Sequence, residues 1–332
     1  MALNTSKFFF MMSLLLSTLI IIASNSWFSA WMALEINLLS FISLITNSSN
    51  MLASEAALKY FLVQTLASAS LLLFILLNQF FSNSLHKEIL SSLTSATLLF
   101  KLGAAPFHFW FPSIMEGLTW LNCFILMTWQ KIAPLVLLFN LSKNILLAAT
   151  VISSIIVGSL GSLNQLSLRK LMAYSSITHL GWLLAAMMVN SNLWYIYIFI
   201  YTLVNSAMIY TFSGESLYHM IQIFMMNLNP KLKFFLFSNL LSLGGLPPFL
   251  GFLPKWLVIQ SISYSNTTLL VIMVILTLMT LFVYMRLAFL AFMFLYPSGK
   301  WSPKKTTFMS PLFISSLSII SLPVISLMSF HL

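Results

Sequence analysis

The chain has 332 residues, of which 60% are hydrophobic and only 6% are charged. A soluble globular domain carries about 25% charged residues, so this composition indicates an all-α polytopic membrane protein. The net charge is +10, but no run of basic residues is longer than two, which argues against a nucleic-acid partner. A single cysteine, Cys123, argues against iron–sulfur clusters, structural zinc and an internal disulfide.

Eleven apolar segments follow one another along the chain, each about as long as a bilayer-crossing helix of roughly 20 residues. They cover residues 8–23, 26–46, 56–78, 89–110, 117–140, 144–163, 168–189, 193–215, 233–260, 267–294 and 308–330. Together they form one membrane domain over residues 1–332, and the first segment is expected to be retained as a span.

The basic residues of the loops support this count. Nine of them fall on one side of an eleven-span topology, namely Lys7, Lys59, Arg169, Lys170, Lys231, Lys233, Lys300, Lys304 and Lys305. The other side has Lys87 and Lys143. The positive-inside rule predicts such a bias, and it places the N-terminus on the positive side of the membrane and the C-terminus on the opposite side.

Five segments carry an ionisable residue well inside the span: Glu35, Lys101, Lys131, His179 and Lys255. A charge at the bilayer centre costs about 2.5–3.5 kcal/mol, so these groups are expected to face one another, water or a polar cavity. One glutamate cannot neutralise three lysines, so the surplus lysines are expected to be partly desolvated and to lose a proton readily.

Structural explanations compete for single members of this set. A mid-span lysine can belong to a fixed ion pair, and His179 alone can be a hydrogen-bonded core residue. For His108 the sequence leaves packing and a secondary relay role both open. Arg286 lies toward the end of its segment, where a long basic side chain is expected to reach the interface.

Two segments are interrupted by glycine and proline. "KLGAAPFHFW" contains Gly103 and Pro106, and "SLGGLPPFLGFLPKW" contains Gly244, Gly245, Pro247, Pro248, Gly251 and Pro254. A broken membrane helix frees backbone polar groups, which is tolerated where they are buried in protein or line water. Discontinuous helices of this kind are a recurring device in transporters.

The spacing of these features suggests an internal duplication. Gly103 and Gly244 are 141 residues apart, and Glu35 and His179 are 144 apart. Two five-helix repeats would then cover residues 8–140 and 144–294, with the helix at 308–330 outside them. A unit with an odd number of crossings inverts its second copy. The match is imperfect, because Lys101 precedes its break and Lys255 follows its own.

Several strings between residues 24 and 290 resemble the chain 2 family of NADH–ubiquinone oxidoreductase, the antiporter-like subunit 2 of mitochondrial complex I. They are "WMALEINLLSF", "EAALKYFLVQ", "KLGAAPFHFWFPSIMEGLTW", "TWQKIAPL", "GSLNQLSLRKLMAYSSITHLGW" and "LSLGGLPPFLGFLPKW". The resemblance implies two inverted bundles, each with a broken helix, joined by a polar axis at the membrane midplane. Full-length relatives have fourteen spans, and this chain resembles the animal form that lacks the first three.

The resemblance also implies roles for the buried residues. Glu35 and Lys101 would form a carboxylate–lysine pair, Lys131 would be the central relay lysine, His179 a connecting group, and Lys255 the lysine of the second broken helix. These groups would take part in redox-driven proton translocation. NADH, FMN, iron–sulfur clusters and ubiquinone would bind elsewhere in the complex, and no cofactor would bind this chain.

The implied location is the mitochondrial inner membrane, with the N-terminus in the matrix and the C-terminus in the intermembrane space. The implied partners are other membrane-arm subunits, including neighbouring antiporter-like ones, and phospholipids. The residues leave three alternatives open: an autonomous cation/proton antiporter, a structural scaffold whose charges form fixed ion pairs, and, with less support, a quinone-binding enzyme.

Overall fold

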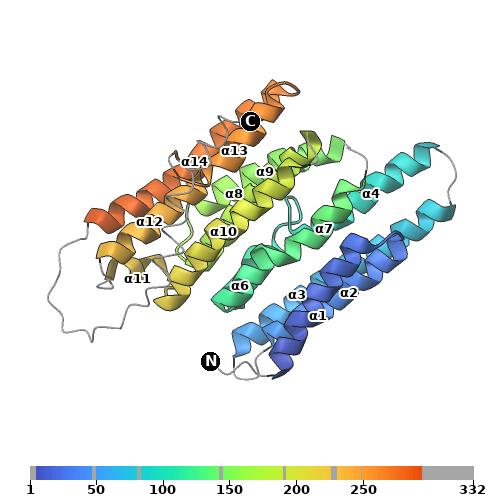
Figure 1. Ribbon diagram of the computed structural model, residues 1–332, viewed down its shortest axis with the longest axis horizontal. Helices are drawn as coiled ribbons and strands as arrows, with labels where there is room; N and C mark the ends of the chain where they lie inside the picture. The colour runs from blue at the N-terminus through green and yellow to red at the C-terminus, as the bar shows by residue number, and fades with distance from the viewer. Residues whose placement is uncertain are drawn as a thin grey trace. The chain divides into compact units, whose positions relative to one another are not determined.

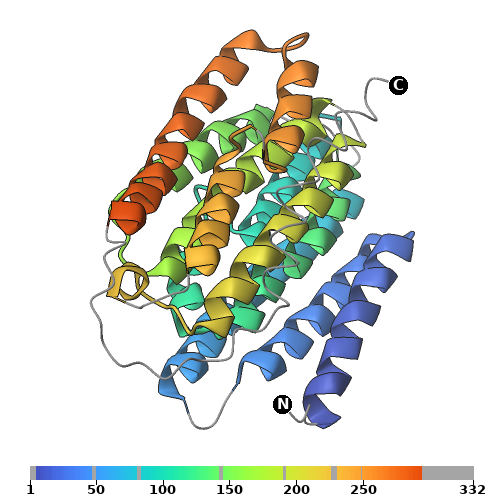
Figure 2. The same ribbon diagram turned by 60° about the vertical axis from the view of Figure 1, so that its left-hand side comes forward.

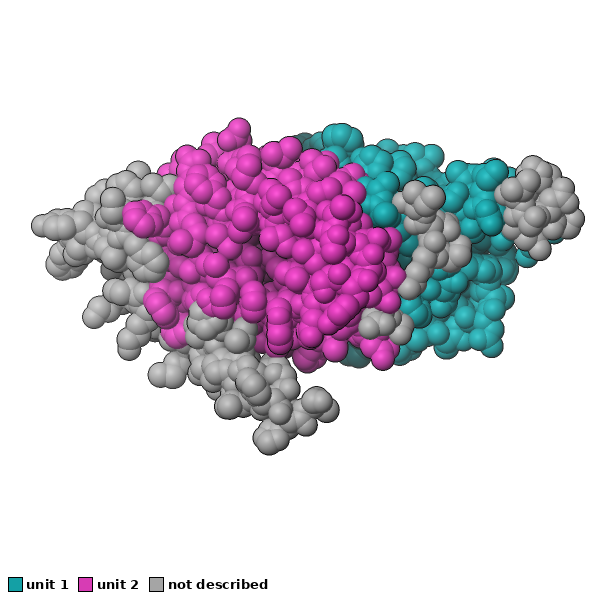
Figure 3. Space-filling view, turned by 90° about the horizontal axis from the view of Figure 1, so that it is seen from above, with its two compact units in different colours: residues 1–150 teal, residues 151–332 magenta. Residues whose placement is uncertain are grey.

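The structure is a computed structural model that describes residues 5–46, 50–80, 84–141, 145–189, 192–225, 230–247 and 249–293. The described residues are nearly all helical. Contacts divide the chain into two compact units, residues 1–150 and 151–332, which are coloured separately in Figure 3.

The first unit is a bundle of long apolar helices and shorter helical pieces. It contains α1 (Thr5–Ala23), α2 (Trp27–Ile45), α3 (Met51–Phe80), α4 (Ser84–Leu102), α5 (Trp110–Gly117), α6 (Trp120–Met127) and α7 (Trp129–Phe139). Helix α2 packs on α1 and α3, α3 also packs on α4 and α5, and α4 packs on α7 (Figure 1). Within an α-helix the backbone N–H and C=O groups bond to one another. An apolar segment that forms a helix can therefore cross lipid without leaving backbone polar groups unpaired.

The second unit is arranged around α9. It contains α9 (Leu168–Val189), α10 (Leu193–Gly214), α11 (Met220–Met225), α12 (Pro230–Gly244), α13 (Phe252–Ile262) and α14 (Thr267–Met293), while α8 (Ile145–Ser162) crosses the boundary between the units. Of the 22 residues of α9, 17 are buried. Helices α10 and α13 pack on α9, and α12 packs on α10 and α14 (Figure 2).

Seven helical segments among the described residues are long and apolar enough to cross a membrane. They are α1, α2, α3, Trp120–Phe139 (α6 with α7), α9, α10 and Thr267–Phe289 of α14. Helix α8 is apolar but shorter. The segment expected at 233–260 is divided into α12 and α13, and the one expected at 89–110 is helical up to Leu102, where α4 ends, and meets α5 only at Trp110. The chain is therefore a multi-pass helical membrane protein.

Some details differ from the expected spans. The segment expected at 117–140 is divided at Thr128 into α6 and α7, and the short α11 was not expected. The segment expected at 308–330 lies outside the described residues. The count of eleven spans stays a prediction.

Candidate functional site

Lys101 and Lys131 line the same internal cavity of the first unit. Lys101 is 7% exposed near the end of α4, and Lys131 is 3% exposed in the first turn of α7. The cavity has a volume of ≈ 20 Å³, which is enough for about one water molecule. Its uncharged polar lining comes from Asn37, Tyr60, Gln64 and Gln130. Two of the buried lysines expected from the sequence are thus brought together.

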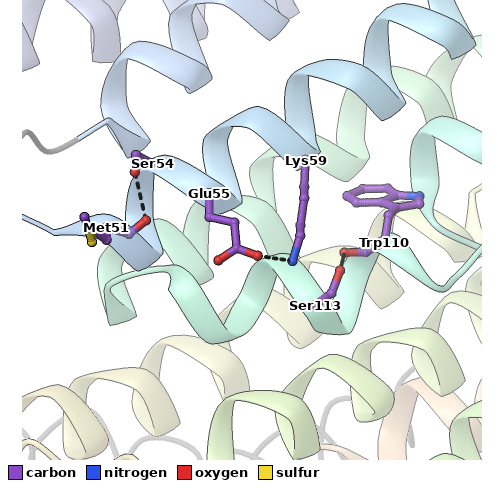
Figure 4. A network of polar contacts seen from close by, with 6 residues as sticks. All are labelled: Met51, Ser54, Glu55, Lys59, Trp110 and Ser113. Atoms are coloured by element: carbon purple, nitrogen blue, oxygen red, sulfur yellow. Dashed lines mark hydrogen bonds and ion pairs between the residues drawn. The ribbon is translucent and has the colours of Figure 1, made fainter.

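Glu35 lies beside this cavity but does not line it. It is only half-buried on α2, and it attracts Lys101 electrostatically. An ion pair joins Glu55 to Lys59 at 2.7 Å near the start of α3 (Figure 4), and none joins the described side chains of Glu35 and Lys101. Any effect of Glu35 on Lys101 therefore acts without a direct ion pair.

Uncharged side chains form hydrogen bonds around the two lysines. The Tyr60 hydroxyl donates to Gln130 Oε1 at 3.4 Å, and Gln130 Nε2 donates to Asn37 Oδ1 at 3.1 Å. Gln64 Nε2 donates to the carbonyl of Lys101 at 3.3 Å. These are residues that a search for charges does not find. Their signal in the sequence is an isolated amide or phenol on the buried face of an otherwise apolar helix.

The break between α4 and α5 has a defined backbone conformation. Gly103 has a φ of 71°, its N–H donates to the Phe100 carbonyl at 3.1 Å, and the Ala104 N–H donates to the Leu99 carbonyl at 3.1 Å. This pair of bonds is the Schellman motif, whose left-handed position favours glycine. The Ala105–Pro106 peptide bond is cis.

His108 belongs to this break and not to the lysine cavity. It is 8% exposed, its Nδ1 lies 3.3 Å from the Pro106 carbonyl oxygen, and its ring centroid lies 4.2 Å from that of Phe109. It is absent from the lining of the cavity between Lys101 and Lys131. These contacts are those of a packed residue and favour that reading over a relay.

The break between α12 and α13 repeats the same backbone geometry. Gly245 has a φ of 81°, its N–H donates to the Ser242 carbonyl at 3.0 Å, and the Leu246 N–H donates to the Leu241 carbonyl at 3.3 Å. The helix ends are separated by residues 245–251 here and by residues 103–109 in the first break. Pro247 is exposed in this turn, and Pro248 lies outside the described residues.

The hydrogen bonds correct the pairing of the two breaks. The sequence pairs Gly103 with Gly244, but Gly244 is the last residue of α12, and the left-handed glycine is Gly245, 142 residues after Gly103. At the same spacing, the bond from Phe107 N–H to the Ala104 carbonyl (2.8 Å) matches one from Phe249 to Leu246 (2.9 Å). The spacing between equivalent positions is therefore 142 and not 141.

Lys255 binds the backbone of the second break. Its Nζ donates to the Gly244 carbonyl at 2.8 Å and to the Leu243 carbonyl at 3.4 Å, and the residue is 7% exposed. A cation at the C-terminus of a helix is stabilised by the free carbonyls and by the helix dipole. At the first break, the indole of Trp110 donates to the Phe100 carbonyl at 3.2 Å instead.

His179 contacts two tyrosines of α10. Its Nδ1 lies 2.8 Å from the Tyr197 hydroxyl, and its ring centroid lies 5.0 Å from that of Tyr201. A cavity of ≈ 10 Å³ is bounded by these three side chains and by residues of the second break, including Leu243 and Gly251. Lys255 does not line this cavity, but its hydrogen-bond acceptor Leu243 does.

Arg286, a basic residue inside a long apolar helix, is exposed on α14. Its exposure fits a side chain that reaches toward the interface. Within the described ranges, no group of three or more His, Cys, Asp or Glu side chains is placed to hold a metal ion. The polar groups of the described site are lysine, histidine, tyrosine and amide side chains.

Comparisons with known proteins agree on one family. Residues 24–280 match the family described as NADH:quinone oxidoreductase/Mrp antiporter, TM. The chain is 52% identical over 302 residues to NADH-ubiquinone oxidoreductase chain 2 of Anopheles gambiae, covering 89% of this chain and 88% of the relative. It is 50% identical over 304 residues to the protein of that name from Aedes aegypti, covering 90% and 89% of the two chains.

Solved structures share the fold at lower identity. A chain of respiratory complex I from Thermus thermophilus superposes with a TM-score of 0.86 at 23% identity, covering 98% of this chain and 79% of that one. A chain of the Mrp complex from Dietzia sp. gives a TM-score of 0.74 at 15% identity, covering 84% and 59%.

Proposed function

Because this chain belongs to the NADH-ubiquinone oxidoreductase chain 2 family, we propose that it is a membrane-arm subunit of respiratory complex I and takes part in redox-driven proton translocation. NADH, FMN, iron–sulfur clusters and ubiquinone bind other subunits. The partners are neighbouring membrane-arm subunits, including antiporter-like ones, and phospholipids. The chain crosses the mitochondrial inner membrane, with the N-terminus in the matrix and the C-terminus in the intermembrane space; the bias of loop lysines and arginines supports this orientation.

The proposed architecture has eleven spans, with inverted five-helix repeats over residues 8–140 and 144–294 and a further helix at 308–330. The support is the pair of helix breaks, which share a Schellman motif, a seven-residue separation and a constant spacing of 142 residues. The Schellman motif by itself ends many helices, so the weight lies on the equal separation and on the matching bonds of Phe107 and Phe249. An inverted duplication explains both breaks at once.

In the first unit, the proposed step is proton transfer between Lys101 and Lys131. The observation that carries it is the shared cavity, because a water there can accept hydrogen bonds from one lysine and donate to the other. The carboxylate of Glu35, on neighbouring α2, attracts the positive charge of a protonated Lys101. When that attraction is removed, Lys101 releases its proton toward Lys131, and the amides of Gln64 and Gln130 orient the intervening water.

In the second unit, His179 and Lys255 are the proposed proton carriers. A protonated Lys255 is held by the carbonyls at the end of α12, so its charge and the geometry of the break depend on each other. His179 lies across a small cavity from the same break. The break therefore provides polar backbone between the two groups.

The test is Lys131→Met, which keeps the length of the side chain and removes its proton-carrying group. We expect NADH-driven proton pumping per assembled complex to be lost in membranes from cells that carry this variant. The matched control is Lys59→Met, because Lys59 is 47% exposed and pairs with Glu55 near the start of α3. Normal pumping in the Lys131 variant would refute the proposed role.

One observation favours a structural role for part of the site. Lys255 caps two carbonyls of α12, which by itself explains a buried lysine. If its role is only to cap, Lys255→Met will reduce the amount of assembled complex and leave turnover per complex unchanged. If it carries protons, turnover per assembled complex will fall as well.

A further inference from the structure

Tyr197 is a buried phenol that faces a buried imidazole. It is 1% exposed on α10, and its hydroxyl oxygen lies 2.8 Å from Nδ1 of His179, which is 6% exposed on α9. Tyr201, one helical turn further along α10, also lies near the imidazole, at 5.0 Å between ring centroids. His179 thus meets two tyrosines from one face of α10.

The chemistry of histidine gives this contact a consequence. The two ring nitrogens are distinct, and the hydrogen bond at one of them decides which nitrogen carries the proton. A phenol has one O–H to donate, and a neutral imidazole that accepts it at Nδ1 must carry its own proton at Nε2. The hydroxyl oxygen can also accept from an Nδ1–H, so the contact fits either neutral form, and the direction of this hydrogen bond decides which form is present.

We propose that Tyr197 is a positioning residue for His179. Its hydroxyl donates to Nδ1 and holds the neutral ring in the Nε2–H form, so protons reach and leave His179 through Nε2. The inference rests on the proposed function, in which His179 carries protons. It adds a residue that no charge pattern reveals and assigns the two ring nitrogens different tasks.

The same helix supplies a matched control. Tyr195 lies two residues before Tyr197 but is 54% exposed. Tyr197→Phe and Tyr195→Phe each remove a single hydroxyl and keep the ring, so they differ in burial and in contact with His179. Each variant is compared in the intact complex, in membranes from cells whose chain 2 carries the substitution.

The measurement is the rate of NADH-driven proton pumping and of NADH:quinone turnover, both per assembled complex. We expect Tyr197→Phe to lower both rates about two- to tenfold, because the net free energy of one hydrogen bond corresponds to a rate change of that size. Tyr195→Phe should change neither. A hydroxyl that only filled its packing site would alter the amount of complex but not the rate per complex, and equal rates in the two variants would overturn the inference.

A double variant separates this inference from the proposed function. If Tyr197 acts through His179, Tyr197→Phe adds no further loss of rate to that of His179→Gln. If the two losses add, the tyrosine acts independently and the inference fails. If His179→Gln alone leaves pumping unchanged, the proposed role of His179 falls as well. If His179→Gln abolishes pumping while Tyr197→Phe has no effect, only the positioning role is refuted.

Discussion

Gly245→Ala is the substitution whose effect follows most directly from the second helix break. A Cβ at this position would lie 2.8 Å from Lys255 Cδ and 3.1 Å from its Nζ, at a φ of 81°. The left-handed conformation costs a non-glycine residue about 1–2 kcal/mol. The lysine is flexible and can move aside, but it then loses the Gly244 and Leu243 carbonyls, and a hydrogen bond from a charged group contributes about 1.5–3 kcal/mol.

Together these effects predict a loss of about 2.5–5 kcal/mol at the break. The assay is the amount of assembled complex on native gels and the temperature at which NADH:quinone activity is lost in isolated membranes. Both should fall clearly. Gly214→Ala is the matched control, because a Cβ at Gly214 meets nothing within 4 Å. If Gly245→Ala behaves like the control, the reasoning that ties Lys255 to the break is wrong.

Three further substitutions test other parts of the structure. Gly251→Ala should reduce the assembled complex on native gels more than Gly245→Ala does, because its Cβ would overlap the backbone carbonyl of Ser242, which cannot swing aside. Gln130→Leu should lower proton pumping per complex severalfold while the complex still assembles, since the lysine cavity loses its bridging amide. Glu55→Gln should leave both pumping and thermal inactivation unchanged, because an exposed ion pair contributes about 0–1 kcal/mol.

The buried lysines could be predicted from the sequence for a simple physical reason. A charge inside an apolar span is too costly to face lipid, so it must face something polar. The expectation was that the buried charges face one another, water or a polar cavity, and Lys101 and Lys131 line one cavity. It could not predict that Asn37 and Gln130 complete the lining, because neutral side chains impose no comparable cost and many face other ways.

The helix breaks were visible in the sequence, but their register was not. In the Gly244–Gly245 pair, either residue can adopt a left-handed conformation, and only the backbone hydrogen bonds show that Gly245 does. The partners of Lys255 were hidden for a related reason. They are main-chain carbonyls, which every residue carries, so no pattern of side chains marks them.

Tyrosines were equally hard to sort from sequence. Tyr195 and Tyr197 lie in the same apolar run, yet one is exposed and the other meets His179. A tyrosine in a membrane helix usually reports an interface position. Only the rotation of α10 against α9 distinguishes a lipid-facing ring from one that binds a histidine.

In the proposed mechanism, the two buried lysines of the first unit exchange a proton across water. The most direct measurement is an experimental density map of the intact complex at a resolution that shows ordered water. At least one water is expected between Lys101 and Lys131, hydrogen-bonded to the amides or the phenol that line the cavity. A dry cavity, or lysine side chains that turn away from each other toward lipid, would contradict it.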